Sequence, residues 1–164
     1  MRKYILILSI LTLGLASCLK ENPQPVIPPP VDPAVQAKID DDVIKAYLVA
    51  HPDIVATKDA SSGLYYQIQT EGTGDLITSS NTVTVSYVGT TTKDQTFDSS
   101  SNFTTTLTPQ TNIIEGWKIG LLKAKKGSKI LLILPSALAY GQRGNGPIGS
   151  YQVILFTITV KDVR

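Results

Sequence analysis

The chain has 164 residues, of which 17% are charged, and its formal net charge is +2. A length and charge of this kind indicate one ordinary globular domain and exclude the strongly basic class of nucleic-acid-binding proteins. A single His and a single Cys also exclude an intramolecular disulfide and a zinc site built from several His and Cys ligands.

Residues 1–17 have the pattern of a secretory signal peptide. Arg2 and Lys3 form the positive start, and the apolar run that follows is too short to span a membrane as a helix. The run ends at Leu15-Ala16-Ser17-Cys18, which resembles the lipobox of bacterial lipoproteins. We therefore expect lipid on the sulfur of Cys18; a buried small residue or a nucleophile are the alternatives for a lone thiol.

Residues 18–33 are rich in Pro and are expected to form an extended tether, with a Pro-rich ligand for another protein as the alternative. Loss of Arg2 and Lys3 with the signal leaves 13 of the 15 basic residues against 13 acidic ones, so no nucleic-acid partner is expected. The expected partner at this end is a membrane, held through the lipid. Leu19 is not the Asp of an inner-membrane retention signal, and Lys20-Glu21 resembles an export tag, which favours the outer membrane and leaves the leaflet open.

A helix of about fifteen residues is predicted to begin at Asp32-Pro33 and to end at His51-Pro52. Residues 34–62 are accordingly assigned to an N-terminal helix and its connector. We expect the apolar stripe of the helix to dock on the domain, with a dimer contact as the alternative. The stripe consists of Val35, Ile39, Val43, Ala46, Tyr47 and Ala50.

Two polar features of this helix are expected to be structural. Asp40-Asp41-Asp42 suggests a calcium site, but three consecutive helical residues point in different directions, so we expect solvated side chains. His51 would be needed for a Ser-His-Asp or Cys-His pair, yet its place at a helix end favours a capping role.

From Gly63 the hydrophobic period changes to two, which predicts antiparallel strands. The segment Lys129 to Leu134 is apolar on both faces, as expected of a central strand that is covered on both sides. A short helix is predicted at residues 116–123, with Trp117 and Leu121 on one face. The alternating apolar positions are Leu64, Tyr66 and Ile68, then Val83, Val85 and Tyr87, and finally Ile154, Phe156, Ile158 and Val160.

Together these elements predict an α+β fold, in which a curled antiparallel sheet wraps around one short α-helix and an N-terminal helix precedes it. The domain is assigned to residues 63–164. The Gly-bearing segments 71–74 and 144–146 are expected to be turns, because neither follows a strand and opens a helix as a phosphate loop does.

Five segments carry large apolar residues near expected turns, which predicts one concave apolar surface with Asp98 as its only charge. They are Tyr87-Val88-Gly89, Phe97-Asp98-Ser99-Ser100, Ile113-Ile114-Glu115-Gly116-Trp117, Ala139-Tyr140-Gly141 and Ile154-Leu155-Phe156. In order and approximate spacing they resemble the signature segments of FKBP-type peptidyl-prolyl cis-trans isomerases, over roughly residues 63–163. The lipobox, tether and first helix resemble the lipoprotein members of that family in Bacteroidetes-type bacteria.

The resemblance implies an enzyme that isomerises X-Pro bonds without metal or cofactor. The implied catalytic residues are Asp98, Tyr87, Tyr140, Phe97 and Phe156, and the implied substrate-binding residues are Phe103, Ile113, Ile114, Trp117 and Ile148. In the family the Trp is the floor under the proline ring, so here Trp117 would be the floor. The Ile114 amide and the Tyr140 hydroxyl would donate to substrate carbonyls. The implied partners are proline-containing polypeptides and macrolides of the FK506 and rapamycin type.

Taken one at a time, these residues have simpler interpretations. Periodicity alone assigns Trp117, Phe156, Ile113 and Ile114 to an ordinary core, and Asp98 alone would be a turn or capping residue. Residues 98–102 have the composition of an exposed loop. The alternative function is a chaperone or adaptor that binds proline-containing peptides without turnover. Gly149 and Ser150 stand where many members have prolines, which predicts a more mobile pocket rim.

Overall fold

The computed structural model describes residues 27–164, so the expected signal peptide, Cys18 and most of the Pro-rich tether lie outside the described residues. Within this range, neither α-helix is long and apolar enough to cross a membrane. In chain order the elements are α1 (Pro33–Ala50), β1 (Thr57–Lys58), β2 (Tyr65–Thr70), β3 (Thr82–Thr91), β4 (Thr96–Thr106), α2 (Glu115–Leu121), β5 (Lys129–Leu134), the 3-10 turns η1 (Ser136–Leu138) and η2 (Gly141–Arg143), and β6 (Ile154–Val163).

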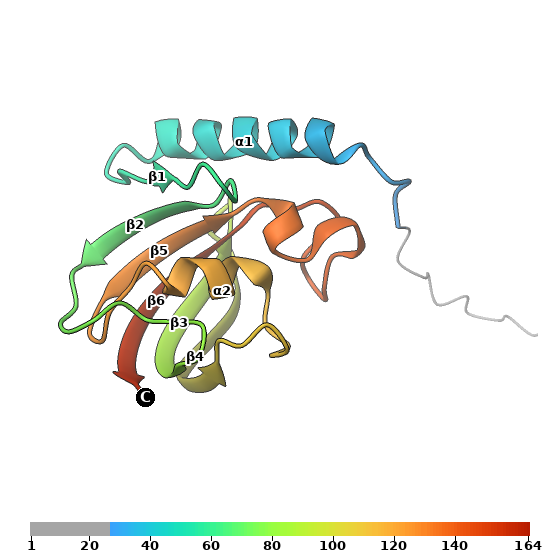
Figure 1. The fold of residues 1–164 in the computed structure, drawn as a ribbon. Coiled ribbons are helices and arrows are strands. Elements are labelled where there is room, and N and C mark those ends of the chain that lie inside the picture. Colours follow the sequence, from blue (N-terminus) through green and yellow to red (C-terminus); the bar gives the residue numbers. More distant parts are fainter. Residues whose placement is uncertain (1–26) are drawn as a thin grey trace, which may run out of the picture.

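The six strands form one antiparallel sheet in the order β1-β2-β5-β6-β3-β4. The sheet curves around α2, and α1 lies across its other side (Figure 1). This arrangement confirms the predicted α+β fold. The short helix also forms where it was expected, although it ends two residues earlier than predicted.

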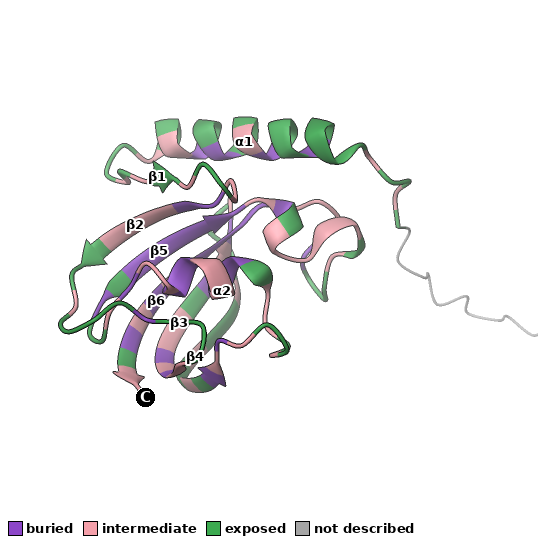
Figure 2. Cartoon of the chain, viewed as in Figure 1, coloured by how far each residue is buried: buried purple, intermediate pink, exposed green. Residues whose placement is uncertain are grey.

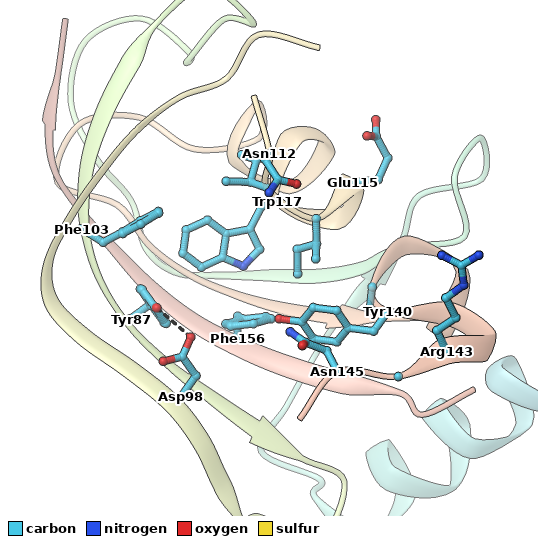
Figure 3. A pocket seen from close by; sticks show the side chains of 14 residues that line it. Tyr87, Asp98, Phe103, Asn112, Glu115, Trp117, Tyr140, Arg143, Asn145 and Phe156 are labelled. Carbon is cyan, nitrogen blue, oxygen red and sulfur yellow. Dashed lines mark hydrogen bonds between the residues drawn. The ribbon is translucent and has the colours of Figure 1, made fainter. Parts of the chain in front are cut away.

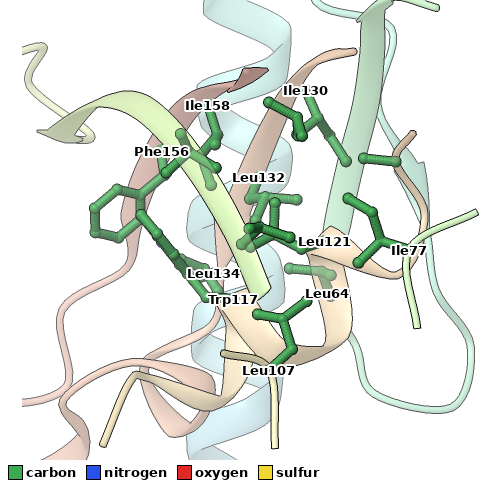
Figure 4. Close-up of a cluster of buried hydrophobic side chains, with 14 of the residues drawn as sticks. Leu64, Ile77, Leu107, Trp117, Leu121, Ile130, Leu132, Leu134, Phe156 and Ile158 are labelled. Carbon is green, nitrogen blue, oxygen red and sulfur yellow. The ribbon is translucent and has the colours of Figure 1, made fainter. Parts of the chain in front are cut away.

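Strand β5 is buried on both faces, as its sequence predicted (Figure 2). Ile130, Leu132 and Leu134 belong to the core on the side of α2, which also holds Trp117 and Phe156 (Figure 4). Leu131 and Ile133 point the other way, into a second cluster under α1 with Ile44, Tyr47 and Leu155. Because successive strand residues face opposite sides, one short segment joins both cores.

Close contact between α2 and β5 depends on two glycines. A Cβ at Gly120 would lie 2.5 Å from Cδ1 of Leu132, and one at Gly116 would overlap the side chain of Leu134. No larger residue fits at either place without moving the helix away from the strand. The glycines therefore set the depth at which Trp117, between them, enters the core.

Residues 98–102 form part of β4, so the expected loop is wrong. The segment is polar because β4 is an edge strand with much of its length exposed. Pairs of hydroxyl groups join β4 to β3. The Oγ1 atoms of Thr84 and Thr104, for example, lie 3.0 Å apart. Cross-strand Thr pairs of this kind stabilise a sheet without burying apolar surface.

The ends of α1 and its docking on the domain confirm the prediction, but the face of the helix that docks is not the one expected. Asp32 caps the helix by accepting from the Ala34 N–H at 2.8 Å. Five of the six residues of the expected stripe point to solvent instead, with Val35 53%, Ile39 47% and Val43 39% exposed, and only Tyr47 is buried. The buried residues are Gln36, Asp40, Ile44 and Tyr47. Asp40 faces the domain because it finds a partner there in Ser136, and Gln36 is buried beside it as a donor to Asp40. The helical pattern of apolar residues does not reveal this.

The expectation of three solvated aspartates is also wrong. Asp40 is 1% exposed and bonded on both oxygens. Asp41 receives bonds from Lys45, Lys58 and Tyr65, which hold its pKa well below the usual range. Only Asp42 is exposed, in an i,i+4 pair with Lys38.

His51 caps the end of α1, as predicted, and also joins it to the β3–β4 turn. Its Nδ1 lies 2.8 Å from the Tyr47 carbonyl oxygen, and its Nε2 lies 3.4 Å from a carboxylate oxygen of Asp94. The Tyr47 hydroxyl donates to the other Asp94 oxygen at 2.9 Å. The carbonyl of Tyr47, followed by the charges of Asp94 and Asp53, raises the pKa of His51 above its ordinary value.

This raised pKa predicts that the protein is more stable at pH 6 than at pH 8. A raised folded-state pKa contributes stability below the unfolded value of about 6.5 and loses it as the pH rises through the folded value. His51 is the only His in the chain, so no other side-chain imidazole titrates in this window. The measurement is the urea midpoint at the two pH values. The difference should shrink in His51→Gln, and equal midpoints in the wild type would show that the contact is not formed.

Candidate active site

A cavity of about 700 Å³ opens between α2 and the inner face of the sheet (Figure 3). A volume of this size matches the pockets that bind small molecules or a few peptide residues. Strands β3, β4 and β6, helix α2 and the loops before α2 and after β5 all contribute to its lining. Eight of the ten candidate site residues lie on it, namely Tyr87, Asp98, Phe103, Ile113, Ile114, Trp117, Tyr140 and Phe156.

Four aromatic rings from different elements form the interior of the pocket. The centre of the Trp117 ring lies 5.0 Å from that of Tyr87, 5.3 Å from that of Phe156 and 5.9 Å from that of Phe103. All three pairs are nearly perpendicular, the edge-to-face geometry that aromatic rings prefer. Because each ring holds its neighbours, the pocket presents a fixed apolar surface around an indole that is 4% exposed.

Phe97 and Ile148, the other two candidates, do not line the pocket. Phe97 lies behind Phe156, with ring centres 5.5 Å apart, and both rings cross the backbone of β3 at Gly89. A Cβ at Gly89 would lie 2.7 Å from Phe97 and 2.8 Å from Phe156, so glycine is needed there. Ile148 is 3% exposed and packs in the core, because its pairing with Asn145 turns it inward.

Tyr87 and Asp98 form a hydrogen bond at one side of the pocket. The Tyr87 hydroxyl donates to a carboxylate oxygen of Asp98 at 2.8 Å, across neighbouring strands. Burial of the ring, together with this bond and charge, raises the pKa of Tyr87 to about 12. The phenol stays protonated at every physiological pH and remains a hydrogen-bond donor to the Asp98 carboxylate, which is itself exposed to solvent.

Two N–H groups at the pocket have no acceptor within residues 27–164. The indole Nε1 of Trp117 is buried without a hydrogen bond, and Figure 3 shows it on the side of Tyr140 and Phe156. The backbone N–H of Ile114, which precedes α2, is likewise absent from the hydrogen bonds of this region. A buried donor without a partner, such as the Trp117 N–H, costs about 1–3 kcal/mol. Ile114 is half-buried and lines the pocket, so its N–H is available to a carbonyl oxygen that enters.

The mouth of the pocket is more polar than the sequence predicted. Asn112, Glu115, Arg143 and Asn145 also line it, so Asp98 is not the only charge there. The sequence did not predict Arg143 and Asn145 as pocket residues, because they lie in a loop with no hydrophobic period. Their position between Tyr140 and Ile148, two candidates from the same loop, was the one available signal.

The pattern of the family described as "FKBP-type peptidyl-prolyl cis-trans isomerase" matches residues 74–161 of this chain. Among proteins of similar sequence, FkpA of Aeromonas hydrophila, an FKBP-type peptidyl-prolyl cis-trans isomerase, is 35% identical over 78% of this chain and 50% of its own length. Peptidyl-prolyl cis-trans isomerase Mip of Coxiella burnetii is 31% identical over 73% of this chain and 53% of its own length. The chain thus spans about half the length of these relatives.

Solved structures are similar as well. The crystal structure of FkpA from Escherichia coli superposes with a TM-score of 0.64 at 29% identity, covering 80% of this chain and 63% of that one. The crystal structure of AtFKBP13 gives the same TM-score at 27% identity, and covers 68% of this chain and all of the other.

Proposed function

Because the chain belongs to the family of FKBP-type peptidyl-prolyl cis-trans isomerases, we propose that it accelerates the isomerisation of X-Pro bonds in the pocket described above. The observation that carries the proposal is the aromatic cluster, in which Tyr87, Phe103 and Phe156 each lie edge-to-face on Trp117 at the floor, with the Tyr87–Asp98 pair at one side. A proline ring is apolar and compact, and it fits such a floor. The polar groups at the mouth suit the peptide on either side of it.

The reaction needs no bond to be made or cleaved. Rotation about an X-Pro bond faces a barrier of about 18–20 kcal/mol, because amide resonance must be broken. Without a catalyst it takes tens to hundreds of seconds. Resonance puts negative charge on the carbonyl oxygen, and water stabilises that charge. An apolar pocket that replaces the water therefore stabilises the planar ground state less than water does, and so lowers the energy needed to reach the twisted state.

The polar groups extend this argument. We assign the Ile114 N–H and the Tyr140 hydroxyl to substrate carbonyls outside the rotating bond, where they would hold the peptide in place. Asp98 would lie beside the rotating amide. A carboxylate there opposes negative charge on the amide oxygen, so it raises the energy of the planar form more than that of the twisted form. Tyr87 would keep the carboxylate in position.

A protease-coupled assay that follows cis-to-trans conversion of a chromogenic X-Pro peptide tests this function. A rate above background that a macrolide of the FK506 type suppresses would support it. Trp117 is the only Trp in the chain, so its fluorescence reports directly whether a macrolide or peptide has entered. Binding without any rate would favour a chaperone or adaptor that holds proline-containing peptides. The absence of both rate and binding would exclude this pocket as the functional site.

We propose further that the protein acts outside the cytoplasm on proline-containing polypeptides, anchored in the outer membrane by lipid on Cys18. The support is the order of a positive start, an apolar run and Leu15-Ala16-Ser17-Cys18 in the sequence. We expect wild-type protein in cells fed an alkyne fatty acid to take up the label and to sediment with membranes, and Cys18→Ala to do neither. Labelling that persists in Cys18→Ala would contradict the anchor.

A further inference from the structure

Three contacts tie the N-terminal segment, defined here as residues 27–50, to the chain that follows β5. Asp40 of α1 binds Ser136 at the start of η1. The other two contacts come from the residues before α1, where Pro28 binds Gln142 and Val31 binds Tyr151. The chain between Ser136 and Tyr151 carries one whole side of the pocket mouth, so these contacts bear on the geometry of the site.

The first contact is a fully bonded carboxylate in the interior. Asp40 and Ser136 are each 1% exposed. One Asp40 oxygen accepts from the N–H of Ser136 at 2.8 Å and from its hydroxyl at 2.7 Å, and the other accepts from Gln36 Nε2 at 2.8 Å. A buried carboxylate is costly unless every oxygen is satisfied. Here both oxygens are satisfied, and the oxygen that binds Ser136 fixes the backbone where η1 begins.

The other two contacts hold the loop further along. Gln142 Nε2 donates to the Pro28 carbonyl at 2.7 Å, and the Val31 N–H donates to the Tyr151 hydroxyl at 3.0 Å. Tyr151 has a φ of +55°, a conformation that non-glycine residues rarely adopt, and its own N–H closes the loop on the Gly141 carbonyl at 2.8 Å. A strained residue persists where its surroundings keep it in place, and the N-terminal segment contributes to this through the bond from Val31 to Tyr151.

The groups held in this way face the pocket. Tyr140, Arg143 and Asn145 all line it, and none of them belongs to a strand. Gly141 and Gly144 have φ values of +57° and +66°, so the backbone of this loop is intrinsically free. Ser136 is linked directly to this loop, because its carbonyl accepts from the N–H of Ala139, next to Tyr140, at 3.0 Å.

We propose that the N-terminal segment positions the pocket mouth, and that Asp40, acting through Ser136, is a positioning residue for Tyr140. The expected change in KM rests on the proposed isomerase function. The expected change in the order of the loop rests on the contacts alone. This positioning also gives the chain next to the proposed lipid anchor a role in shaping the active site, beyond that of a spacer.

The kinetic test compares three variants on one X-Pro peptide. Asp40→Ala should raise KM at least fivefold with little change in kcat, because a displaced Tyr140 loses contact with the bound peptide equally in ground and transition states. Asp40→Asn, which keeps an oxygen for Ser136, should stay within twofold of wild type. Asp42→Ala, on the same helix but exposed, is the matched control and should have no effect. An unchanged KM in folded, active Asp40→Ala overturns the inference.

Amide hydrogen exchange tests the same inference without any activity. Asp40→Ala should speed exchange in residues 137–151 and leave residues 82–106, in β3 and β4, unchanged. Should Asp40→Ala fail to fold, Gln142→Ala removes the second contact from a half-buried site and should speed exchange in residues 141–151. Unchanged exchange there overturns the inference. An inactive wild type would count against the proposed function alone.

Discussion

Phe156→Ala is expected to lower kcat/KM by more than tenfold. The Phe156 ring contacts Tyr87, Phe97 and Trp117, with ring centres 5.9, 5.5 and 5.3 Å away. Its loss widens the pocket, admits water to the rotating amide and lets the Trp117 ring tilt. Water that reaches the carbonyl oxygen stabilises the planar amide, which is the ground state, and a tilted Trp117 ring holds the proline ring less firmly. The rate is measured with the protease-coupled assay under conditions where the variant remains folded.

The same change also destabilises the fold, so it needs a control variant that loses a similar amount of folding stability. Removing a buried Phe side chain costs about 3–5 kcal/mol of stability, and removing a buried Leu about 2–5 kcal/mol. Leu155 is the adjacent residue, is also 2% exposed, and points to the other face of the sheet, under α1. Leu155→Ala should therefore lose comparable stability and keep its rate. Equal losses of rate in the two variants would indicate general softening of the sheet, and a preserved rate in Phe156→Ala would mean that the site is elsewhere.

The pairing of these neighbours shows why much of the fold was predictable. Alternation in β6 and the double-sided apolar run of β5 assign residues to faces, since a strand has only two. Short-range signals also worked, because Asp32 and His51 act on backbone groups within a turn of themselves. The resemblance to known isomerases then supplied eight residues that line the pocket.

The errors at α1 have one physical origin, which is a partner distant in the sequence. Asp40 is buried because Ser136, 96 residues later, needs an acceptor, and no local pattern records that. Because α1 docks through the face that carries Asp40, Val35, Ile39 and Val43 point to solvent. Ile148 was displaced from the pocket by a pairing with Asn145 inside an irregular loop. Apolar periodicity reports how much surface a segment buries, but it does not report which distant polar group the segment meets.

Asp98→Ala is also expected to lower kcat/KM by more than tenfold, for an electrostatic reason. The carboxylate would lie beside the rotating amide, where its charge opposes the resonance charge on the carbonyl oxygen. Asp98→Asn keeps an oxygen for the Tyr87 hydroxyl but removes the charge, so it should lose nearly as much. Because Asp98 is exposed, either change should alter stability by no more than about 0.5 kcal/mol. The loss should fall on kcat, since it concerns the transition state.

Tyr87→Phe separates the charge from its support. The variant removes the 2.8 Å hydrogen bond and leaves the carboxylate, so it should lose less rate than Asp98→Ala. The double variant should be no worse than Asp98→Ala alone, because Tyr87 is proposed to act only through Asp98. Asp75→Ala, an exposed carboxylate before β3, is the control and should keep the full rate. A full rate in folded Asp98→Ala would mean that apolar walls suffice for rotation. The Tyr87–Asp98 bond would then serve only to hold the Tyr87 ring against Trp117.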